Sequence, residues 1–483
     1  MTKKTQNALD RYGPMSRRAF LARSGAGALA LSLPSKLVGA EVGSSKQFAL
    51  SAGKSTAQLV SESHPTTSVW AYNEIIPGPE IRVRQGDRVG IAVENNLDEE
   101  TTVHWHGLRV PNAMDGVPHL TQTPIAIGGN FHYQFDVPDA GTYWYHPHQR
   151  GFEQVGRGLY GAFIVEEQEP IVVDRDITWV LDDWRLDRDA QIRNDFNNRH
   201  DASHNGRVGN TVTINGQIPT TLNVQQGERI RLRLINAANA RIFNLEFANH
   251  EPWIIALDGQ PVEPHHSPTN SIVLGPAMRA DLIIDMTADP DQRYQVTDSF
   301  YRDLEYTLID IAYDATARRE QLLDTSMSLP LNTMPEPEWA GIERHEIRFN
   351  GGMMGNMMMS GNSGMNMMQM MREGKMWTIN GVAASGHVMD PLLTLKQGRS
   401  YHFELLNDTA WHHPIHLHGH SFRVVSRNGK ETQHREWQDT VLMAPEERVG
   451  IAFVADSLGD WMFHCHIFEH QAAGMMGVVR VST

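Results

Sequence analysis

One short pattern occurs three times along the chain at long intervals, and this repeat restricts the possible folds more than any other feature. Each copy opens with Gln-Gly and reaches an Asn ten residues after the Gln, at Gln85–Asn95, Gln226–Asn236 and Gln397–Asn407. Within the copies apolar residues alternate with others, as in Ile230–Leu234, which is typical of a strand with one buried face. The copies are roughly 140 and 170 residues apart, too far for a solenoid unit and suitable for whole sandwich domains.

The rest of the chain also favours short strands. Turn sequences precede each copy, helical heptads are absent, and 40 glycines and 24 prolines interrupt the sequence. The length of 483 residues corresponds to about three domains, each large enough for its own core. We therefore predict an all-β protein of three tandem β-sandwich domains, at residues 46–167, 168–325 and 340–483.

The first forty residues differ from the rest and have the composition of a removable export signal. They hold seven basic side chains and one acidic side chain, followed by the apolar run Ala26–Leu33 and the small residues Val38–Ala40. Ser16–Leu21 resembles the twin-arginine signal, so we predict a signal peptide at residues 1–40, export by the twin-arginine machinery and a periplasmic location. No later stretch is long and apolar enough to predict a membrane span.

The net charge and the cysteine content limit the classes of molecule that the chain can bind. The formal net charge is −15, and loss of the basic signal makes the mature chain more acidic, which argues against binding nucleic acid or an anionic membrane. Cys465 is the single cysteine and cannot form a disulfide within the chain. In an oxidising compartment it must be buried, modified or bound to a metal. We predict that the chain is a monomer.

Four His-x-His pairs carry the strongest chemical signal, two in the first predicted domain and two in the third. They are His104/His106, His146/His148, His416/His418 and His464/His466. On a strand, residues i and i+2 point to one face, so each pair presents two imidazoles side by side. A single such pair is more often two ordinary surface histidines, but four at matched positions indicate eight metal ligands that converge between the two domains.

The centre of the last pair is Cys465, whose thiolate is predicted to face away from its neighbours toward a second site. His413, His470 and Met475 are placed to join it. Two imidazoles, a thiolate and a weak thioether describe a type 1 blue-copper centre. Zinc is the rival metal, but structural zinc sites rarely use methionine. Pro147 stands in the first domain where Cys465 stands in the third, so one blue centre is predicted.

These four segments resemble the copper-binding motifs of the multicopper oxidase family, and the three-domain arrangement extends the resemblance over the mature chain. The resemblance implies cupredoxin-like Greek-key domains and four coppers. The type 1 copper would be held by His413, Cys465, His470 and Met475, and the type 2 copper by His104 and His416. The two type 3 coppers would be held by His106, His146 and His466, and by His148, His418 and His464.

The family resemblance also implies the reaction. A reducing substrate would be oxidised one electron at a time, and four electrons would reduce dioxygen to water, with Cys465 joined directly to ligands of the dioxygen site. Asp115 resembles the proton-relay acid of the family, although a turn aspartate before Gly116 is an equal interpretation. Gln471 stands where several relatives carry an acid, so the sequence leaves a second relay acid without a candidate.

A methionine-rich insert suggests the reductant. Residues 353–371 hold ten methionines: Met353, Met354, Met357, Met358, Met359, Met365, Met367, Met368, Met370 and Met371. Thioethers prefer Cu(I), and a similar insert is found in the copper-efflux oxidases, which oxidise cuprous ion. Asp408 and His412 are candidates for a substrate copper site, although the methionine expected before the His-Pro motif is missing. A flexible linker is the alternative for the insert.

Two other functions compete with cuprous oxidation. One is a laccase-like oxidase of phenols. The other is a copper-free periplasmic scaffold of the same fold, which would lack the copper ligands that this chain has. Trp411, His412, His420 and the remaining histidines, including His265 and His266, are predicted to be structural.

Overall fold

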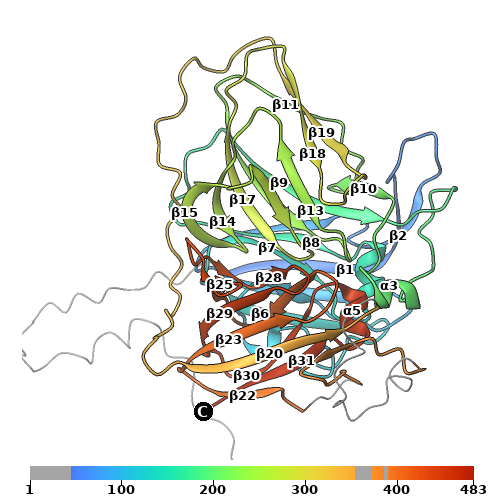
Figure 1. The fold of residues 1–483 in the computed structure, drawn as a ribbon. Coiled ribbons are helices and arrows are strands. Elements are labelled where there is room, and N and C mark those ends of the chain that lie inside the picture. Colours follow the sequence, from blue (N-terminus) through green and yellow to red (C-terminus); the bar gives the residue numbers. More distant parts are fainter. Residues whose placement is uncertain (1–44, 354–371, 386–389) are drawn as a thin grey trace, which may run out of the picture. The chain divides into compact units, whose positions relative to one another are not determined.

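The computed structural model describes residues 45–353, 372–385 and 390–483. The predicted signal peptide and Met354–Met371 lie outside these residues. Strands make up almost all of the regular structure in the described part, and they form six sheets (Figure 1). The predicted all-β class is confirmed.

Residues of the first predicted domain form two four-stranded sheets. One has the order β2-β1-β4-β6 and contains β1 (Ser45–Ala57), β2 (Thr67–Tyr72), β4 (Arg88–Asn95) and β6 (Asn130–Asp136). The other has the order β3-β8-β7-β5 and contains β3 (Gly78–Arg84), β5 (His104–His106), β7 (Gly141–His146) and β8 (Gly161–Glu166). An apolar core that includes Trp105 joins residues of both sheets.

The middle of the chain forms a six-stranded and a five-stranded sheet. The first, β10-β9-β12-β17-β14-β15, contains β9 (Arg175–Trp184), β10 (Thr211–Ile214), β12 (Arg229–Asn236), β14 (Trp253–Leu257), β15 (Gln260–His266) and β17 (Arg279–Asp285). The second, β11-β19-β18-β13-β16, contains β11 (Thr221–Val224), β13 (Phe243–Phe247), β16 (Ser271–Leu274), β18 (Arg293–Asp298) and β19 (Tyr306–Tyr313).

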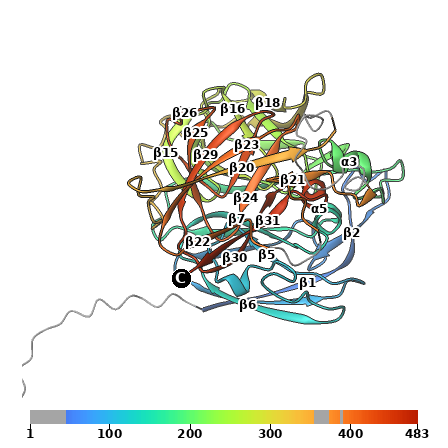
Figure 2. The same cartoon turned by 60° about the horizontal axis from the view of Figure 1, so that its bottom comes forward.

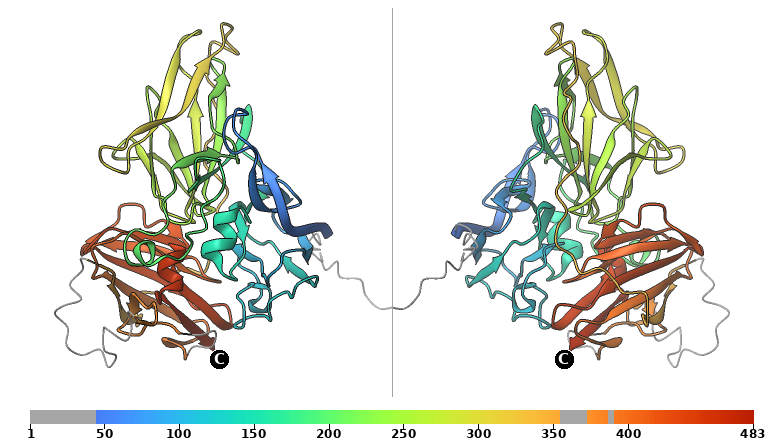
Figure 3. Two further views of the ribbon diagram at one scale, coloured as in Figure 1. Left: turned by 90° about the vertical axis from the view of Figure 1, so that its right-hand side faces the viewer. Right: turned by 90° about the vertical axis from the view of Figure 1, so that its left-hand side faces the viewer.

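The last part forms a seven-stranded and a five-stranded sheet. The first has the order β21-β20-β23-β29-β25-β26, with β27 also paired to β25; it contains β20 (Glu343–Gly351), β21 (Trp377–Ile379), β23 (Ser400–Asn407), β25 (Phe422–Arg427), β26 (Lys430–Glu431), β27 (Trp437–Gln438) and β29 (Arg448–Val454). The second, β22-β31-β30-β24-β28, contains β22 (Leu393–Lys396), β24 (His413–Leu417), β28 (Thr440–Met443), β30 (Gly459–Cys465) and β31 (Met476–Ser482). In Figure 3 these strands form the orange to red group, which can be distinguished from the blue to cyan group and from the green to yellow group.

The repeated sequence pattern marks one equivalent strand in each group, namely β4, β12 and β23. Each pairs in parallel with the first strand of its group, which is β1, β9 or β20. Each also pairs antiparallel with a later strand, which is β6, β17 or β29. The Gln-to-Asn repeat therefore corresponds to a central strand used three times.

One prediction for these strands is wrong. The alternation in β12 suggested a single buried face, but all of its residues are buried. Arg231 bonds Glu167 and Asp281, and Arg233 bonds Asp176 and Asp281. The polar face of β12 is thus covered by acidic side chains, because a buried guanidinium is tolerated where carboxylates pair with it.

Helices in the described part are short and lie in connections. They are η1 (Asn112–Met114), α2 (Gly151–Gln154), η2 (Val155–Arg157), α3 (Arg199–Ser203) and α5 (Phe468–Ala472). Helices α3 and α5 lie side by side (Figure 1, Figure 2), although they come from different groups of strands. Among the described residues, no helix has the length and apolar character needed to cross a membrane.

Candidate metal centre

The four histidine motifs lie on two pairs of adjacent strands. β5 pairs with β7 so that His104 is opposite His146, and β24 pairs with β30 so that His416 is opposite His464. Trp105, between the first two motif histidines, is fully buried in the core of the first sandwich. The alternation of the strands therefore separates the ligand-type side chains from the apolar ones.

The eight motif imidazoles meet in one buried group, which we call the eight-histidine cluster. Two subsets each hold three rings with centroids 4.9–5.8 Å apart: His106, His146 and His466 in one, and His148, His418 and His464 in the other. The remaining rings, His104 and His416, have centroids 6.0 Å apart. The structure thus brings together motif imidazoles from two separate pairs of strands, β5 with β7 and β24 with β30.

The hydrogen bonds of these rings leave nitrogen lone pairs free for a metal. A backbone carbonyl can only accept, so a ring nitrogen that bonds one carries the proton and the other nitrogen keeps its lone pair. His104 donates from Nδ1 to the Asp115 carbonyl at 2.7 Å, and His146 donates to the Pro147 carbonyl at 3.0 Å. In the described structure a buried Nε2 has no hydrogen-bond partner in His104, His146, His148, His416 and His466.

Such nitrogens are costly to bury unless they bind something. Burial lowers the pKa of His148 and of His466 well below the ordinary value, so these two imidazoles are neutral. Neutral imidazole is a good ligand for copper. The residues present therefore fit a copper site.

A second buried group, which we call the cysteine cluster, consists of His413, Cys465 and His470. Cys465 Sγ lies 3.5 Å from His413 Nδ1 and 3.7 Å from His470 Nδ1, and the two nitrogens are 3.1 Å apart. Met475 is fully buried, and its backbone N–H donates to the His470 carbonyl at 2.9 Å. Burial lowers the pKa of His470 to about 3 and raises the pKa of the Cys465 thiol.

Hydrogen bonds to the Nε2 atoms, on the side of each ring away from the sulfur, fix the orientations of His470 and His413. His470 donates from Nε2 to the backbone carbonyl of His204 at 2.6 Å. His413 Nε2 lies 2.9 Å from Thr409 Oγ1, whose own hydroxyl donates to Asn407 at 2.7 Å. Both Nδ1 atoms therefore keep their lone pairs next to the sulfur, as a soft metal site requires.

Asp115 is buried against the eight-histidine cluster. His418 donates from Nδ1 to Asp115 Oδ2 at 2.9 Å, and His104 bonds the backbone carbonyl of Asp115. Asp115 also caps the C-terminal end of η1 and precedes Gly116, so it has the turn position as well. Its carboxylate nevertheless contacts a ring of the cluster directly.

A buried group of charges beneath the cluster was missed by the sequence analysis. Asp439 Oδ1 accepts from His106 Nε2 at 3.1 Å, and the Asp439 carbonyl accepts from His416 Nδ1 at 2.8 Å. Arg279 of β17 donates to both oxygens of Asp439, at 2.9 and 2.5 Å. Asp258 accepts from the backbone N–H of Arg279 and of Asp439.

The pKa values in this group reflect the pairing. Burial would raise the pKa of Asp439, but Arg279 outweighs burial and holds it below its ordinary value. Burial, assisted by the charge of Asp439, raises the pKa of Asp258 to about 7. The middle sandwich, which lacks the histidine motifs, thus supports two motif histidines. The signal available in the sequence for this group was the charged Arg279 in the mostly apolar strand β17.

Glu469 is a second residue that the sequence analysis did not single out. It lies in α5 between the motif histidines and is fully buried. Its carboxylate accepts from the backbone N–H of Arg207 at 3.1 Å and from Asn239 Nδ2 at 3.4 Å. Burial raises the pKa of Glu469 to about 7. Glu469 therefore ties α5 to the middle sandwich.

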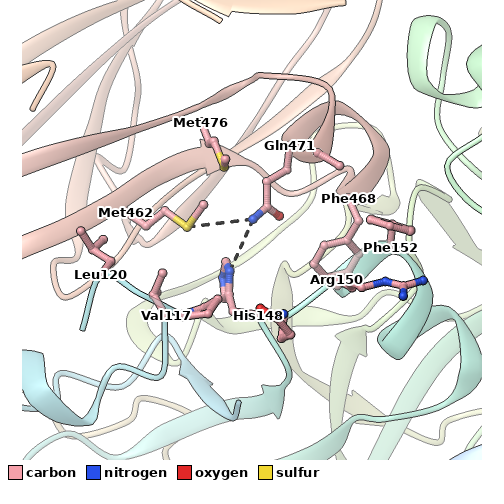
Figure 4. Close-up of a pocket in the computed structure, with 13 residues that line it drawn as sticks. Val117, Leu120, His148, Arg150, Phe152, Met462, Phe468, Gln471 and Met476 are labelled. Carbon is pink, nitrogen blue, oxygen red and sulfur yellow. Dashed lines mark hydrogen bonds between the residues drawn. The ribbon is translucent and has the colours of Figure 1, made fainter. Parts of the chain in front are cut away.

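A cavity of about 340 Å³ opens beside the eight-histidine cluster (Figure 4). Apolar side chains such as Val117, Phe468 and Met462 line it, and His148 reaches into its wall. Gln471 lies 3.4 Å from His148 Nδ1 through its amide nitrogen and 4.0 Å from Met462 Sδ. Gln471, where relatives were expected to carry an acid, therefore stands next to a motif histidine.

The residues proposed for a substrate site are only partly described. Met354–Met371 lie outside the described residues. Met353 donates its backbone N–H to the Ser203 carbonyl and accepts from Trp411 Nε1, both at 2.8 Å. Asp408 accepts from Arg348 at 2.9 Å and from Asn350 at 3.1 Å, so its carboxylate already has two partners.

Comparisons with known proteins identify the family of the chain. Residues 54–170, 175–315 and 358–483 match three family profiles, each described as multicopper oxidase. The chain is 30% identical over 450 residues to the multicopper oxidase MmcO of Mycobacterium tuberculosis, covering 85% of this chain and 82% of that protein.

Solved structures are similar in fold. The multi-copper oxidase from Pseudomonas thermotolerans is 32% identical with a TM-score of 0.80, covering 91% of this chain and 100% of that one. A multicopper oxidase from Campylobacter jejuni, described as a metallo-oxidase, is 30% identical with a TM-score of 0.75, covering 91% of this chain and 92% of that one. Tandem cupredoxin-like sandwiches with buried imidazole and thiol groups define a copper-dependent oxidoreductase. The chain belongs to the multicopper oxidase family, and copper is its cofactor.

Proposed function

We propose that this oxidase takes electrons from cuprous ion and delivers them to dioxygen, which serves copper tolerance. The observation that carries the proposal is the run of ten methionines at 353–371, because thioethers select Cu(I). Its first residue, Met353, is held between Ser203 and Trp411. The similar multicopper oxidase from Campylobacter jejuni is described as a metallo-oxidase, which gives further support.

For copper we propose the ligands that the motifs imply. His413, Cys465, His470 and Met475 would hold the type 1 copper, and the distances within the cysteine cluster support this set. In the eight-histidine cluster, His104 and His416 would hold the type 2 copper, and the two triads of rings would hold the type 3 pair. When bound, four coppers supply the one-electron redox chemistry and the reduction of dioxygen to water.

The protein chain itself links the two clusters and supplies a side chain for proton transfer. Cys465 is joined by peptide bonds to His464 and His466, so the two clusters are covalently continuous. We assign Asp115 the role of proton relay, since its Oδ2 accepts from His418 and it is buried where water must be formed. The apolar cavity that ends at His148 offers a path for dioxygen.

We also propose the limits and the location of the mature protein. The sandwiches would comprise residues 46–167, 168–325 and 340–483, with the methionine-rich insert in the last. The signal at 1–40 would direct the chain through the twin-arginine machinery to the periplasm, where it would act as a monomer.

A test of the substrate replaces all ten methionines of residues 353–371 with leucine. Leucine keeps length and apolar bulk but removes the sulfur donors, so kcat/KM for cuprous ion should fall roughly tenfold or more. A second variant with a Gly/Ser linker in place of the segment should lose cuprous turnover and keep or improve phenol turnover, since bulky phenols need only approach His413 or His470. Steady-state kinetics at equal copper content measure both.

The outcomes separate the candidate functions. If the segment variants keep their kcat/KM for cuprous ion, the methionine-rich segment is a linker, and a laccase-like oxidase of phenols is favoured. Equal losses with both substrates would indicate a role in folding. A protein that binds no copper would point to the scaffold alternative.

Met475 provides a test of the type 1 ligand set. Met475→Leu should raise the reduction potential of this site, because loss of a weak axial donor favours the reduced metal. A tenfold shift toward the reduced form corresponds to about 59 mV for one electron, and we expect at least this change. A redox titration followed at the blue absorption band measures it; an unchanged or lower potential would mean that Met475 is not the axial ligand.

A further inference from the structure

We propose that the side chains of His200 and His204 form a docking site for cuprous ion at the protein surface, next to the cysteine cluster. The proposal rests on the proposed function, since it names where the reductant of that function binds. The sequence analysis treated both residues as structural because they lie outside the four motifs. Their contacts assign them to the surface over α5 instead.

The two imidazoles form an ordered and accessible pair. His200 lies in α3 and His204 directly follows it, four residues later, so both side chains lie on one face. Their rings stack with centroids 4.2 Å apart and an angle of 8° between the planes. The side chain of His200 is 74% exposed. Ions in solution therefore reach the His200 imidazole directly, and His204 beside it is half-buried.

The hydrogen bonds of His204 prepare it as a ligand. Its Nδ1 donates to the His200 carbonyl at 2.9 Å. Ser203 Oγ, 3.0 Å away, donates its own hydrogen to the Arg199 carbonyl and acts as a second acceptor. Because Nδ1 carries the proton, Nε2 keeps its lone pair. A histidine whose other nitrogen bonds a carbonyl is the usual arrangement of a metal ligand.

The same residue touches the cysteine cluster from behind. The backbone carbonyl of His204 accepts from His470 Nε2 at 2.6 Å, and His470 Nδ1 is 3.7 Å from Cys465 Sγ. An ion bound by the His204 imidazole would therefore be connected to His470 through the covalent bonds of His204 and a single hydrogen bond. The ring of Trp411 lies 5.3 Å from the ring of His204 and its Nε1 bonds the Met353 carbonyl, so the methionine-rich insert begins beside the pair.

The chemistry at this site is an outer-sphere loss of one electron. Bound Cu(I) becomes Cu(II) as its electron passes to the oxidase, and the oxidised ion then leaves. Four such events supply the four electrons that, with four protons, convert one dioxygen to two waters. Imidazole binds copper in either oxidation state, so the ion need not change ligands during the transfer.

A second stacked pair provides a matched control. His265 and His434 have ring centroids 4.1 Å apart and an angle of 12° between the planes. His265 donates from Nδ1 to the Glu263 carbonyl at 2.8 Å, so it has the same tautomer as His204. Within the described residues this pair has no hydrogen bond to the cysteine cluster. It reproduces the proposed site without its connection.

The binding arm of the experiment uses Ag(I), which resembles Cu(I) and is not oxidised. The copper-loaded protein is treated with diethyl pyrocarbonate with and without Ag(I), and modification of each histidine is measured by mass spectrometry. We expect Ag(I) to slow modification of His200 and His204 roughly fivefold or more. Unchanged rates at both residues would overturn the proposal. This arm does not depend on turnover.

The kinetic arm uses His200→Ala and His204→Ala, which remove the imidazoles and keep the carbonyl that His470 needs. Each should lower kcat/KM for cuprous ion about tenfold, at least five times more than for a phenol. His265→Ala should leave both unchanged. Equal losses with the two substrates, or a loss in His265→Ala of the same size, would overturn the docking role. If the wild-type protein does not oxidise cuprous ion but Ag(I) still protects the pair, the proposed function fails while the ion site stands.

Discussion

Cys465→Ser should produce a colourless protein that has lost the oxidase reaction while keeping three of its four coppers. The sulfur lies 3.5 and 3.7 Å from the two Nδ1 atoms of the cysteine cluster and is the one thiolate available in the chain. The blue colour of a type 1 centre requires the copper–thiolate bond, and a serine hydroxyl is a poor ligand for Cu(I). We expect turnover to fall by about a thousandfold or more.

The measurement combines visible absorption, copper analysis and electron paramagnetic resonance on the purified variant. The eight-histidine cluster does not use the sulfur, so its type 2 signal should remain. Persistence of the blue band would contradict the assignment of Cys465. A protein that holds only zinc would contradict the copper assignment as a whole.

Arg279→Met should destabilise the protein by about 3–5 kcal/mol, because it leaves a buried carboxylate without its cation. Arg279 and Asp439 are both buried, and the guanidinium donates to both carboxylate oxygens. Asp439 then faces His106 with an uncompensated charge. We therefore also expect the purified variant to hold less copper in the eight-histidine cluster.

The matched control is Arg293→Met, which removes an ion pair with Asp310 at a side chain that is 58% exposed. Exposed pairs contribute about 0–1 kcal/mol, so this variant should unfold close to the wild-type denaturant concentration. The double variant Arg279→Met with Asp439→Asn removes both charges and should recover part of the lost stability. If Arg279→Met were as mild as the control, the buried pair would not support the cluster.

The histidine motifs could be interpreted from the sequence because strands have a fixed period. Alternation alone places His104 and His106 on one face and Trp105 on the other, and the structure has this arrangement. The same period of two led to the wrong prediction that β12 has only one buried face. A period of two predicts two faces, but it does not say that acidic side chains of other strands cover the polar one.

The sequence by itself determined the family, the all-β class and the candidate copper ligands, since these depend on residue type and on spacing along single strands. Only the tertiary structure decided which residues hold those ligands in place. The carbonyl of His204 behind His470, and Arg279 and Asp258 behind Asp439, come from segments far from the motifs. Hydrogen bonds and ion pairs between distant segments depend on how the sandwiches pack, and no local pattern in one strand encodes that packing.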